Sequence, residues 1–307
     1  MRVLLIFIDG IGLGEDDPET NPFANVDLPV LHALSGGQRW LASTGPQTSE
    51  RALFIPTDPR MGVAGRPQSA TGQAAILTGL NVPEMIGEHY GPKPNEPVRA
   101  ILDEDNLFMQ VVAAGKMASM LEAYPPPWHE GVNSGKRIPA SYQYAARAAG
   151  LPFFGADDLR RGEALSGDWT GEGWRSRLDF PDMPLLTPYH AGVRLVELAR
   201  RFDFAFMAHW LTDMVGHRGS IGEAVGLLTT FDQVMAGVLD TWDDTEGVIV
   251  ITSDHGNMEV IGSRTHTLND VPTVIIGDAR HAVGDGLAAL NDIAPRLARL
   301  LLDGRGD

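Results

Sequence analysis

Three apolar runs, each followed by an aspartate, constrain the fold of this chain more than any other feature. The runs are Val3–Ile8, Phe204–Ala208 and Gly247–Thr252, and the aspartates that follow them are Asp9, Asp213 and Asp254. Short, β-branched runs without polar residues are typical of strands that are buried on both faces. Such strands, separated by helical segments, predict an α/β fold: a doubly wound, mostly parallel sheet with helices on both faces. Ligands of such sheets bind at the carboxyl ends of the strands, where the aspartates stand.

Histidines accompany these aspartates at spacings that suit a metal site. His255 directly follows Asp254, and His217 comes four residues after Asp213, so that on a helical turn both side chains share one face. His266 stands in a further loop. One aspartate after a strand is usually a turn or capping residue. Three of them with these histidines predict a dinuclear site, because carboxylate oxygen and imidazole nitrogen together suit Zn²⁺ or Mn²⁺.

A candidate nucleophile lies in the segment Arg66–Gly79, which has the pattern of a loop that enters a short helix and stops at a glycine. Ser69 stands at or just before the first turn of this helix. It could be an ordinary helix cap, or a nucleophile whose alkoxide is favoured by a metal and by the positive helix terminus. The spacing alone does not separate the two roles, and Thr71 is the alternative nucleophile.

These motifs resemble the alkaline phosphatase superfamily, on the branch of cofactor-independent phosphoglycerate mutase and phosphopentomutase. The matching stretches follow the family's order over almost the whole chain: Ile8–Gly10, Gln68–Gly72, Asp213–His217, Ser253–Asn257 and His266–Pro272. The resemblance implies two metal ions, manganese or zinc. It implies that one ion is held by Asp9, Ser69, Asp254 and His255, and the other by Asp213, His217 and His266.

The chain also departs from the family's pattern. The phosphoglycerate mutases are far longer than these 307 residues and carry a longer insertion after the nucleophile. Their nucleophile motif ends in Gly-His, where this chain has Gly72-Gln73. The sulfatase branch needs Cys or Ser followed by x-Pro-x-Arg, whereas Ser69 is followed by Ala-Thr-Gly-Gln and the chain has no cysteine. The metal site is therefore a firmer expectation than mutase activity.

The expected activity is two-metal phosphoryl transfer on a small phosphorylated metabolite, as a phosphatase or a phosphomutase, through a phosphoserine at Ser69. Two divalent ions against three aspartates leave about one positive charge, which suits this chemistry. A phosphodiesterase or phosphonate hydrolase with the same metal site is an alternative, and a non-catalytic family member is a second one. The net charge of −16 and the absence of a basic stripe argue against a nucleic-acid partner.

The sequence divides into a core and an inserted part. Residues 1–83 and 187–307 are predicted to form the metal-binding catalytic α/β core. Residues 84–186 are predicted to form a smaller cap that selects the substrate, because proline and glycine cluster around Tyr124–Trp128 and Asp168–Trp174. Within or near the cap, possible partners for a phosphate or carboxylate are Arg66, Lys93, Lys136 and Arg137. Three tryptophans, Trp128, Trp169 and Trp174, could line a pocket, but aromatic residues of a small cap more often form its core.

The first apolar run is about six residues long and ends at Asp9, which is too short for a signal peptide or a membrane span. We therefore expect a cytoplasmic protein without a membrane partner. The sequence leaves the oligomeric state unknown.

Overall fold

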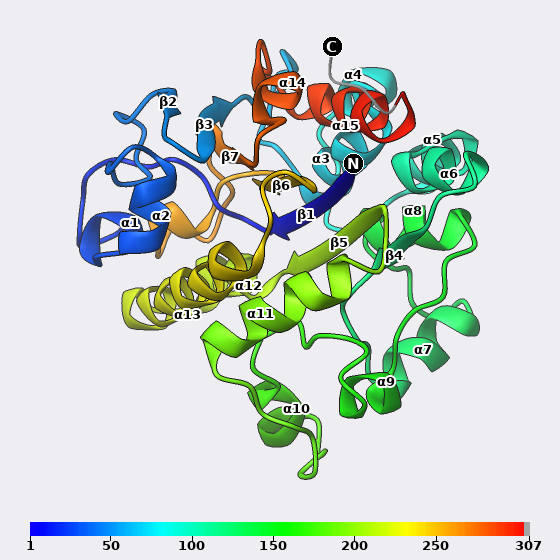
Figure 1. Ribbon diagram of the computed structural model, residues 1–307. Helices are drawn as coiled ribbons and strands as arrows, with labels where there is room; N and C mark the ends of the chain where they lie inside the picture. Colours follow the sequence, from blue (N-terminus) through cyan, green and yellow to red (C-terminus); the bar gives the residue numbers. More distant parts are fainter. Residues whose placement is uncertain (304–307) are drawn as a thin grey trace.

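The computed structural model describes residues 1–303, which form one seven-stranded sheet with helices on both faces (Figure 1). The strands stand in the order β2-β3-β7-β6-β1-β5-β4. Their bounds are β1 Arg2–Ile8, β2 Gln47–Thr48, β3 Ala52–Thr57, β4 Ala118–Met120, β5 Phe204–His209, β6 Gly247–Thr252 and β7 Val271–Ile276. The pairs β6-β1, β1-β5 and β5-β4 are parallel, whereas β7 and β2 run opposite to their neighbours. The predicted α/β fold class is confirmed.

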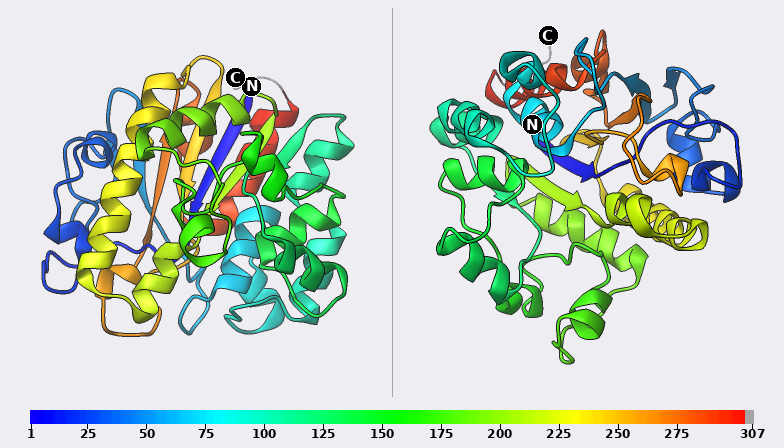
Figure 2. Two further views of the ribbon diagram at one scale, coloured as in Figure 1. Left: turned by 90° about the horizontal axis from the view of Figure 1, so that it is seen from below. Right: turned by 180° about the vertical axis from the view of Figure 1, so that it is seen from behind.

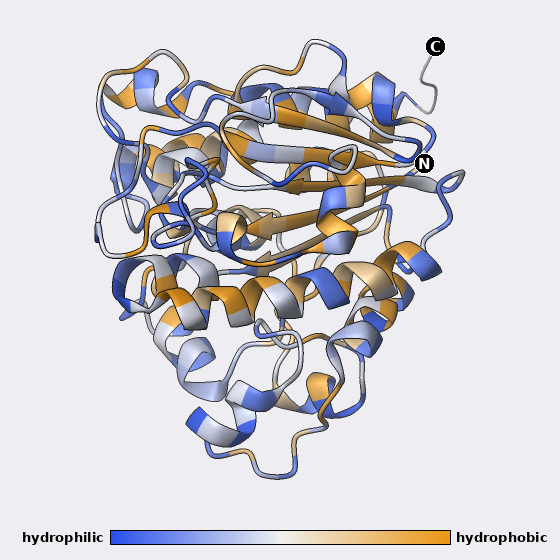
Figure 3. Cartoon of the chain, turned by 90° about the vertical axis from the view of Figure 1, so that its left-hand side faces the viewer, coloured by the Kyte–Doolittle hydropathy of each residue, from blue (hydrophilic) through white to orange (hydrophobic). Residues whose placement is uncertain are grey.

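Alternation along the central strand β1 explains the two layers of helices. Leu4 and Ile6 point into one hydrophobic cluster, and Leu5 and Phe7 point into the other. Successive side chains of a strand point to opposite faces, so an all-apolar strand needs cover on both sides. Figure 3 shows the strands almost entirely in the hydrophobic colour, which is the pattern that allowed them to be recognised in the sequence.

The two faces are covered by different helices (Figure 2). One face carries α1, α2, α11 and α13, with bounds Pro22–Asn25, Pro29–Leu34, Pro188–Ala199 and Ile221–Thr241. The other carries α3 Ser69–Thr78, α4 Val82–Ile86, α5 Glu96–Glu104, α6 Leu107–Ala113, α7 Pro126–Asn133, α8 Ser141–Ala148, α14 Arg280–Gly284 and α15 Ile293–Leu302. The remaining elements are α9 Ala156–Arg160, α10 Glu172–Arg177, α12 Leu211–Arg218, η1 Met258–Val260 and η2 Leu290–Asp292. No helix within residues 1–303 is both long and apolar enough to cross a bilayer.

Strand β3 is an element that the sequence did not indicate. Its segment lies in a region interpreted as a proline- and glycine-rich surface, but β3 pairs antiparallel with β7 over its whole length, with Pro56 opposite Pro272. A proline inside an apolar run normally argues against an interior strand, because it cannot donate to the ladder. Here Pro56 lies opposite Pro272. Neither residue has a backbone N–H, so no carbonyl at this position loses a donor that its partner could have supplied.

The predicted cap, residues 84–186, contains part of the core. Strand β4 pairs parallel with β5 in the main sheet, and α8 packs against α3. The division into core and cap stays a prediction, and β4 itself was not recognised because a three-residue strand gives little periodicity to detect. The later part of this range lies below the sheet in Figure 1, around α7, α9 and α10. It has a small hydrophobic cluster of its own, made by Ala123, Leu159, Ala164, Trp174 and Met183.

Candidate metal centre

The register of the sheet brings the predicted residues together. Ile8 of β1 lies opposite His209 of β5, and Phe7 lies opposite Thr252 of β6, so these three parallel strands end at one edge. The aspartates beyond them therefore meet in space, although Asp9 is more than 200 residues from Asp213 and Asp254 in sequence. Helix α12 begins two residues after β5 and carries Asp213 and His217 into the same place.

Four predicted residues form a buried inner group around one ring nitrogen. His255 Nε2 lies 3.0 Å from Ser69 Oγ, 3.5 Å from Asp9 Oδ1 and 3.6 Å from Asp254 Oδ2. In a serine–histidine–aspartate triad the carboxylate meets the opposite ring nitrogen from the serine. Here the Ser69 hydroxyl and the carboxylates of Asp9 and Asp254 all lie near the same nitrogen, Nε2 of His255. The potential ligand atoms of the four residues therefore converge on one point.

The other three predicted residues form an outer group. Asp213 Oδ1 lies 3.4 Å from His217 Nε2 and 3.8 Å from His266 Nε2, and the two Nε2 atoms are 3.3 Å apart. The Nδ1 of His266 donates to the Pro67 carbonyl, and the Nδ1 of His217 donates to the Arg264 carbonyl. In neutral rings both Nε2 atoms then carry lone pairs. Two lone pairs that face each other repel unless a cation lies between them, so this pair fits a metal ion.

The inner and outer groups touch. The rings of His255 and His266 stack with their centroids 3.6 Å apart. Asp9, Asp213 and His255 each offer a ligand atom within 4.8 Å of the others, so Asp213 of the outer group lies close to the inner group as well. All seven predicted residues thus lie in one cluster. Their division into two ligand sets stays a prediction.

Ser69, and not Thr71, faces the cluster. Ser69 is the first residue of α3, and its hydroxyl contacts His255. The Thr71 hydroxyl instead donates to the Gln68 carbonyl and accepts from the Tyr90 amide. The geometry therefore favours Ser69 as the nucleophile candidate.

The electrostatics of the cluster fit divalent cations. Burial raises the pKa of Asp254 to about 7 and raises the pKa of Asp9 well above its usual range, with the repulsion between neighbouring aspartates adding to both shifts. Burial also lowers the pKa of His255 and of His266 to about 4, so both rings are neutral at physiological pH. A cluster of carboxylates and neutral imidazoles without compensating cations costs free energy. Divalent ions would supply that charge, and the mixture of oxygen and nitrogen donors suits them.

Two amide side chains hold the aspartates in place, and the sequence did not assign them. Gln73 Nε2 donates to Asp254 Oδ2 at 2.9 Å, and Asn257 Nδ2 donates to Asp213 Oδ1 at 2.7 Å. Gln73 is the residue at which the motif departs from the family's Gly-His, so this departure places a hydrogen-bond donor on a predicted ligand. Asn257 lies within the stretch Ser253–Asn257 that matches the family, but only the fold shows that it donates to Asp213.

The cluster opens into a large cleft of about 1720 Å³. Lys93 and Arg137, two of the four suggested anion partners, line this cleft. Arg66 instead donates to the His266 carbonyl at 2.6 Å. The three tryptophans named from the sequence line the cleft but are buried, whereas Trp210 is 40% exposed.

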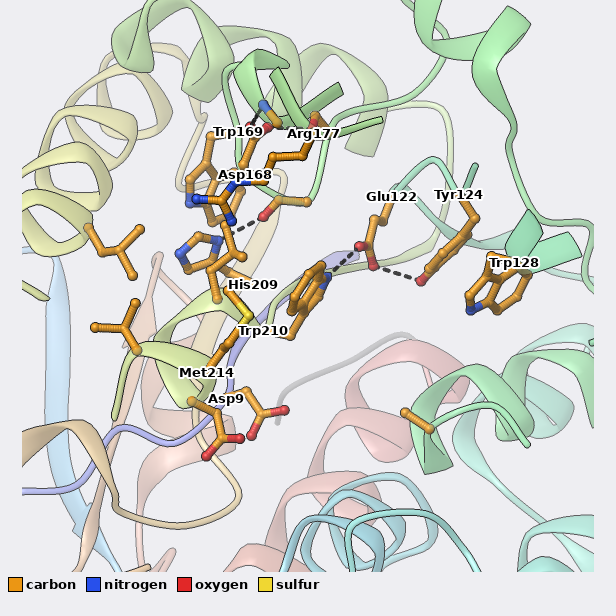
Figure 4. Close-up of a pocket in the computed structure, with 18 of the residues that line it drawn as sticks. Asp9, Glu122, Tyr124, Trp128, Asp168, Trp169, Arg177, His209, Trp210 and Met214 are labelled. Atoms are coloured by element: carbon orange, nitrogen blue, oxygen red, sulfur yellow. Dashed lines mark hydrogen bonds between the residues drawn. The ribbon is translucent and has the colours of Figure 1, made fainter. Parts of the chain in front are cut away.

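Glu122 lies in the wall of the same cleft and was not singled out in the sequence. Its carboxylate accepts hydrogen bonds from Tyr124 at 2.7 Å and Trp210 at 3.0 Å (Figure 4). Burial raises the pKa of Glu122 to about 7, although both hydrogen bonds act in the opposite direction. No local pattern singles out this residue, because a lone glutamate is typical of a solvated surface.

Comparison with known proteins agrees with this geometry. Residues 190–302 match the family model of the metalloenzyme superfamily. A 2,3-bisphosphoglycerate-independent phosphoglycerate mutase of Methylobacillus flagellatus is 29% identical over 127 residues, which cover 38% of this chain and 25% of that protein. The enzyme of the same name from Prochlorococcus marinus is 38% identical over 103 residues, covering 29% of this chain and 19% of that protein. The matches thus span about a quarter or less of these relatives' length.

Solved structures resemble the whole chain. The PH0037 protein of Pyrococcus horikoshii aligns with a TM-score of 0.56 at 18% identity, covering 100% of this chain and 98% of that one. The alkaline phosphatase of the Antarctic bacterium TAB5 aligns with a TM-score of 0.54 at 13% identity, covering 99% and 98%. At these identities the likeness concerns the fold. Together with the family match, it confirms the predicted resemblance to the alkaline phosphatase superfamily of metalloenzymes.

Proposed function

We propose that this chain, which resembles the alkaline phosphatase superfamily in its motifs and its fold, is a two-metal phosphoryl-transfer enzyme that acts on a small phosphorylated metabolite. One observation carries the proposal: the hydroxyl of Ser69, at the start of α3, lies within a cluster of three aspartates and three histidines. The inner group would hold one ion and the outer group the other. Bound there, manganese or zinc would neutralise the transferred phosphoryl group and the oxygens that enter and leave.

Ser69 is the residue that would attack phosphorus. Its place at the N-terminus of the ten-residue helix α3 favours a negative charge on the hydroxyl oxygen. A bond forms between Ser69 Oγ and phosphorus while the bond from phosphorus to the leaving oxygen breaks. The phosphoserine then passes its phosphoryl group to water, as in a phosphatase, or to another hydroxyl, as in a phosphomutase.

Lys93 and Arg137 would bind an anionic part of the substrate. Both line the cleft, and burial lowers the pKa of Lys93 while the neighbouring Asp9 counteracts this shift. Arginine and lysine side chains are the usual partners of phosphate and carboxylate oxygens in such positions. The segments of α7 and α10 would select the organic part of the substrate, since both contribute residues to the wall of the cleft.

The test is an assay on metal-stripped protein resupplied with Mn²⁺ or Zn²⁺. The substrates are p-nitrophenyl phosphate, its bis diester, sugar phosphates and phosphoglycerates. We expect metal-dependent turnover of a monoester that disappears in Ser69→Ala while the fold, checked by circular dichroism, is unchanged. Thr71→Ala is the matched control. Turnover that survives in Ser69→Ala and is lost in Thr71→Ala would contradict the choice of nucleophile.

The same panel separates the alternatives. A phosphodiesterase would hydrolyse the bis diester faster than the monoester. A non-catalytic relative would bind metal and transfer no phosphoryl group from any compound of the panel. A mutase is identified by isomer exchange between phosphoglycerates or sugar phosphates without release of inorganic phosphate.

A further inference from the structure

Glu259 is a buried carboxylate that the proposed chemistry does not use. It lies in η1, four residues after His255, and is 1% exposed. Within residues 1–303, no lysine, arginine or histidine makes an ion pair with it. A buried charge without a cation needs several hydrogen bonds to be tolerated.

Four donors supply these hydrogen bonds, two to each oxygen. Oε2 accepts from the backbone amides of Gly12 at 3.1 Å and Asn257 at 2.7 Å. Oε1 accepts from the Thr267 hydroxyl and from Asn269 Nδ2, the latter at 3.0 Å. The carboxylate thus has a donor for each of its main acceptor positions.

The donors come from the three loops that carry predicted metal ligands. Gly12 follows Asp9 by three residues, Asn257 follows His255 by two, and Thr267 directly follows His266. A fourth ligand-bearing segment, helix α12, is connected to Glu259 through Asn257, because Asn257 Nδ2 donates to the carboxylate of Asp213. The Glu259 side chain therefore connects segments that carry ligands of the inner group with segments that carry ligands of the outer group.

Two glycines pack closely against the carboxylate. A Cβ atom added at Gly12 or at Gly256 would lie 2.2 Å from Glu259 Oε1. These two glycines let the loops after β1 and β6 close directly onto the carboxylate. Its position, and with it the spacing of the loops, is fixed by contact as well as by hydrogen bonds.

We propose that Glu259 is a positioning residue that sets the distance between the ligand-bearing loops and thereby the metal affinity of both groups. This inference rests on the proposed metal site. It predicts that Glu259 acts on metal binding and not merely on folding. Loss of a residue that orients metal ligands without binding the metal itself typically lowers metal affinity 10–100-fold.

Replacing Glu259 by glutamine should affect the two groups unequally. All four partners are donors, so the new amide must turn its NH₂ toward one pair of them. The amides of Gly12 and Asn257 cannot become acceptors, whereas the Thr267 hydroxyl can rotate to accept a hydrogen bond. The NH₂ therefore turns toward Thr267 and Asn269, which loosens the loop of His266. Glu259→Gln should weaken mainly the outer ion, and Glu259→Ala should weaken both.

The experiment measures metal binding directly on the full chain. Calorimetric titration of metal-stripped protein with Mn²⁺ or Zn²⁺ gives the affinity of each ion, and thermal unfolding with and without a chelator gives the stability. The matched control is Asp232→Asn. Asp232 is also a buried carboxylate, and it accepts from the Leu31 amide at 2.9 Å far from the cluster.

We expect Glu259→Gln to bind its weaker ion 10–100-fold less tightly than the wild type. Asp232→Asn should bind both ions normally, whatever its melting temperature in chelator. Wild-type affinities in Glu259→Gln would overturn the inference even if that variant melts earlier, because the role would then be structural only. A wild-type protein that binds no divalent ion would overturn the proposed function and this inference together. If Glu259→Ala does not fold, Glu259→Gln alone decides.

Discussion

The inner and outer groups of the cluster have similar donors but very different surroundings. In the inner group the side chains of Asp254 and His255 are fully buried, and that of Asp9 is 12% exposed. In the outer group the side chains of Asp213 and His217 are 21% and 34% exposed. Asp9, Asp254 and His255 follow strand ends in the middle of the sheet, whereas Asp213 and His217 stand on α12 and line the cleft. Burial is therefore decided by the element that carries a residue.

The difference has electrostatic consequences. Burial raises the pKa values of Asp9 and Asp254, and repulsion from neighbouring aspartates, Asp213 among them, adds to both shifts. In the outer group His266 is buried as well, but Asp213 and His217 are partly exposed, so solvent screens the charge of Asp213. An ion in the inner group would relieve more unfavourable charge and would exchange more slowly than one in the outer group.

The largest expected effect is that of Asp254→Asn. This change removes a buried ligand of the inner group while keeping the shape of the side chain and an acceptor for Gln73. We expect the inner ion to bind more than 100-fold less tightly, beyond the range for loss of an outer partner, and turnover to disappear. Metal analysis after gel filtration checks this. Two ions retained at the wild-type level would contradict the assignment of Asp254 as a ligand of the inner ion.

Asp213→Asn should remove the outer ion with a smaller effect on the inner one. The side chain is partly exposed, and Asn257 already donates to it, so an asparagine oxygen can keep this hydrogen bond. We expect one ion per chain and strongly reduced turnover. Because Asp213 also lies near Asp9 and His255, loss of both ions would show that it bridges the two groups.

A chelator should remove the ion of the outer group before the ion of the inner group. With EDTA added stepwise, the more exposed outer group should lose its ion first, and activity should fall with this first ion. Stopped-flow release of Mn²⁺ or Zn²⁺ into a metal indicator measures the two phases. Release in a single phase would contradict the contrast in burial as the cause of different exchange rates.

The smallest expected effect on metal binding is that of Glu122, which is buried in the cleft wall without a metal partner. Its pKa rises from 4.5 to about 7 on folding, so the folded protein holds this proton more tightly than the unfolded chain does. The wild type should therefore lose stability relative to Glu122→Gln as the pH rises from about 4.5 to 7. Each pKa unit corresponds to about 1.4 kcal/mol, so the difference should reach a few kcal/mol.

Urea unfolding of metal-stripped wild type and Glu122→Gln at pH 5 and pH 7.5 checks this prediction. The gap between the two proteins should widen in favour of the glutamine variant at the higher pH. A gap that is the same at both values would mean that Glu122 ionises normally in the folded protein.

Much of the site was readable because its residues follow strands that are easy to recognise. The runs before Asp9 and Asp254 are apolar throughout, so both the strands and the place of the aspartates could be predicted. The spacing of Asp213 and His217 indicated a helical turn, and α12 confirms it. Strands β3 and β4 were missed because one contains a proline and the other has only three residues. In β3 the apolar run Ala52–Ile55 ends at Pro56 after four residues.

The fold class and the residue types of the cluster follow from the amino-acid sequence alone, because apolar runs and the motifs that follow them are local patterns. Which atoms meet follows from the packing of distant segments: Ser69 and not Thr71 faces His255, Gln73 donates to Asp254, and one carboxylate, Glu259, connects three loops. That packing also decided the burial that shifts the pKa of Glu122. Such features depend on segments brought together by the register of parallel strands, and no local pattern records a distance between residues that are far apart in the chain.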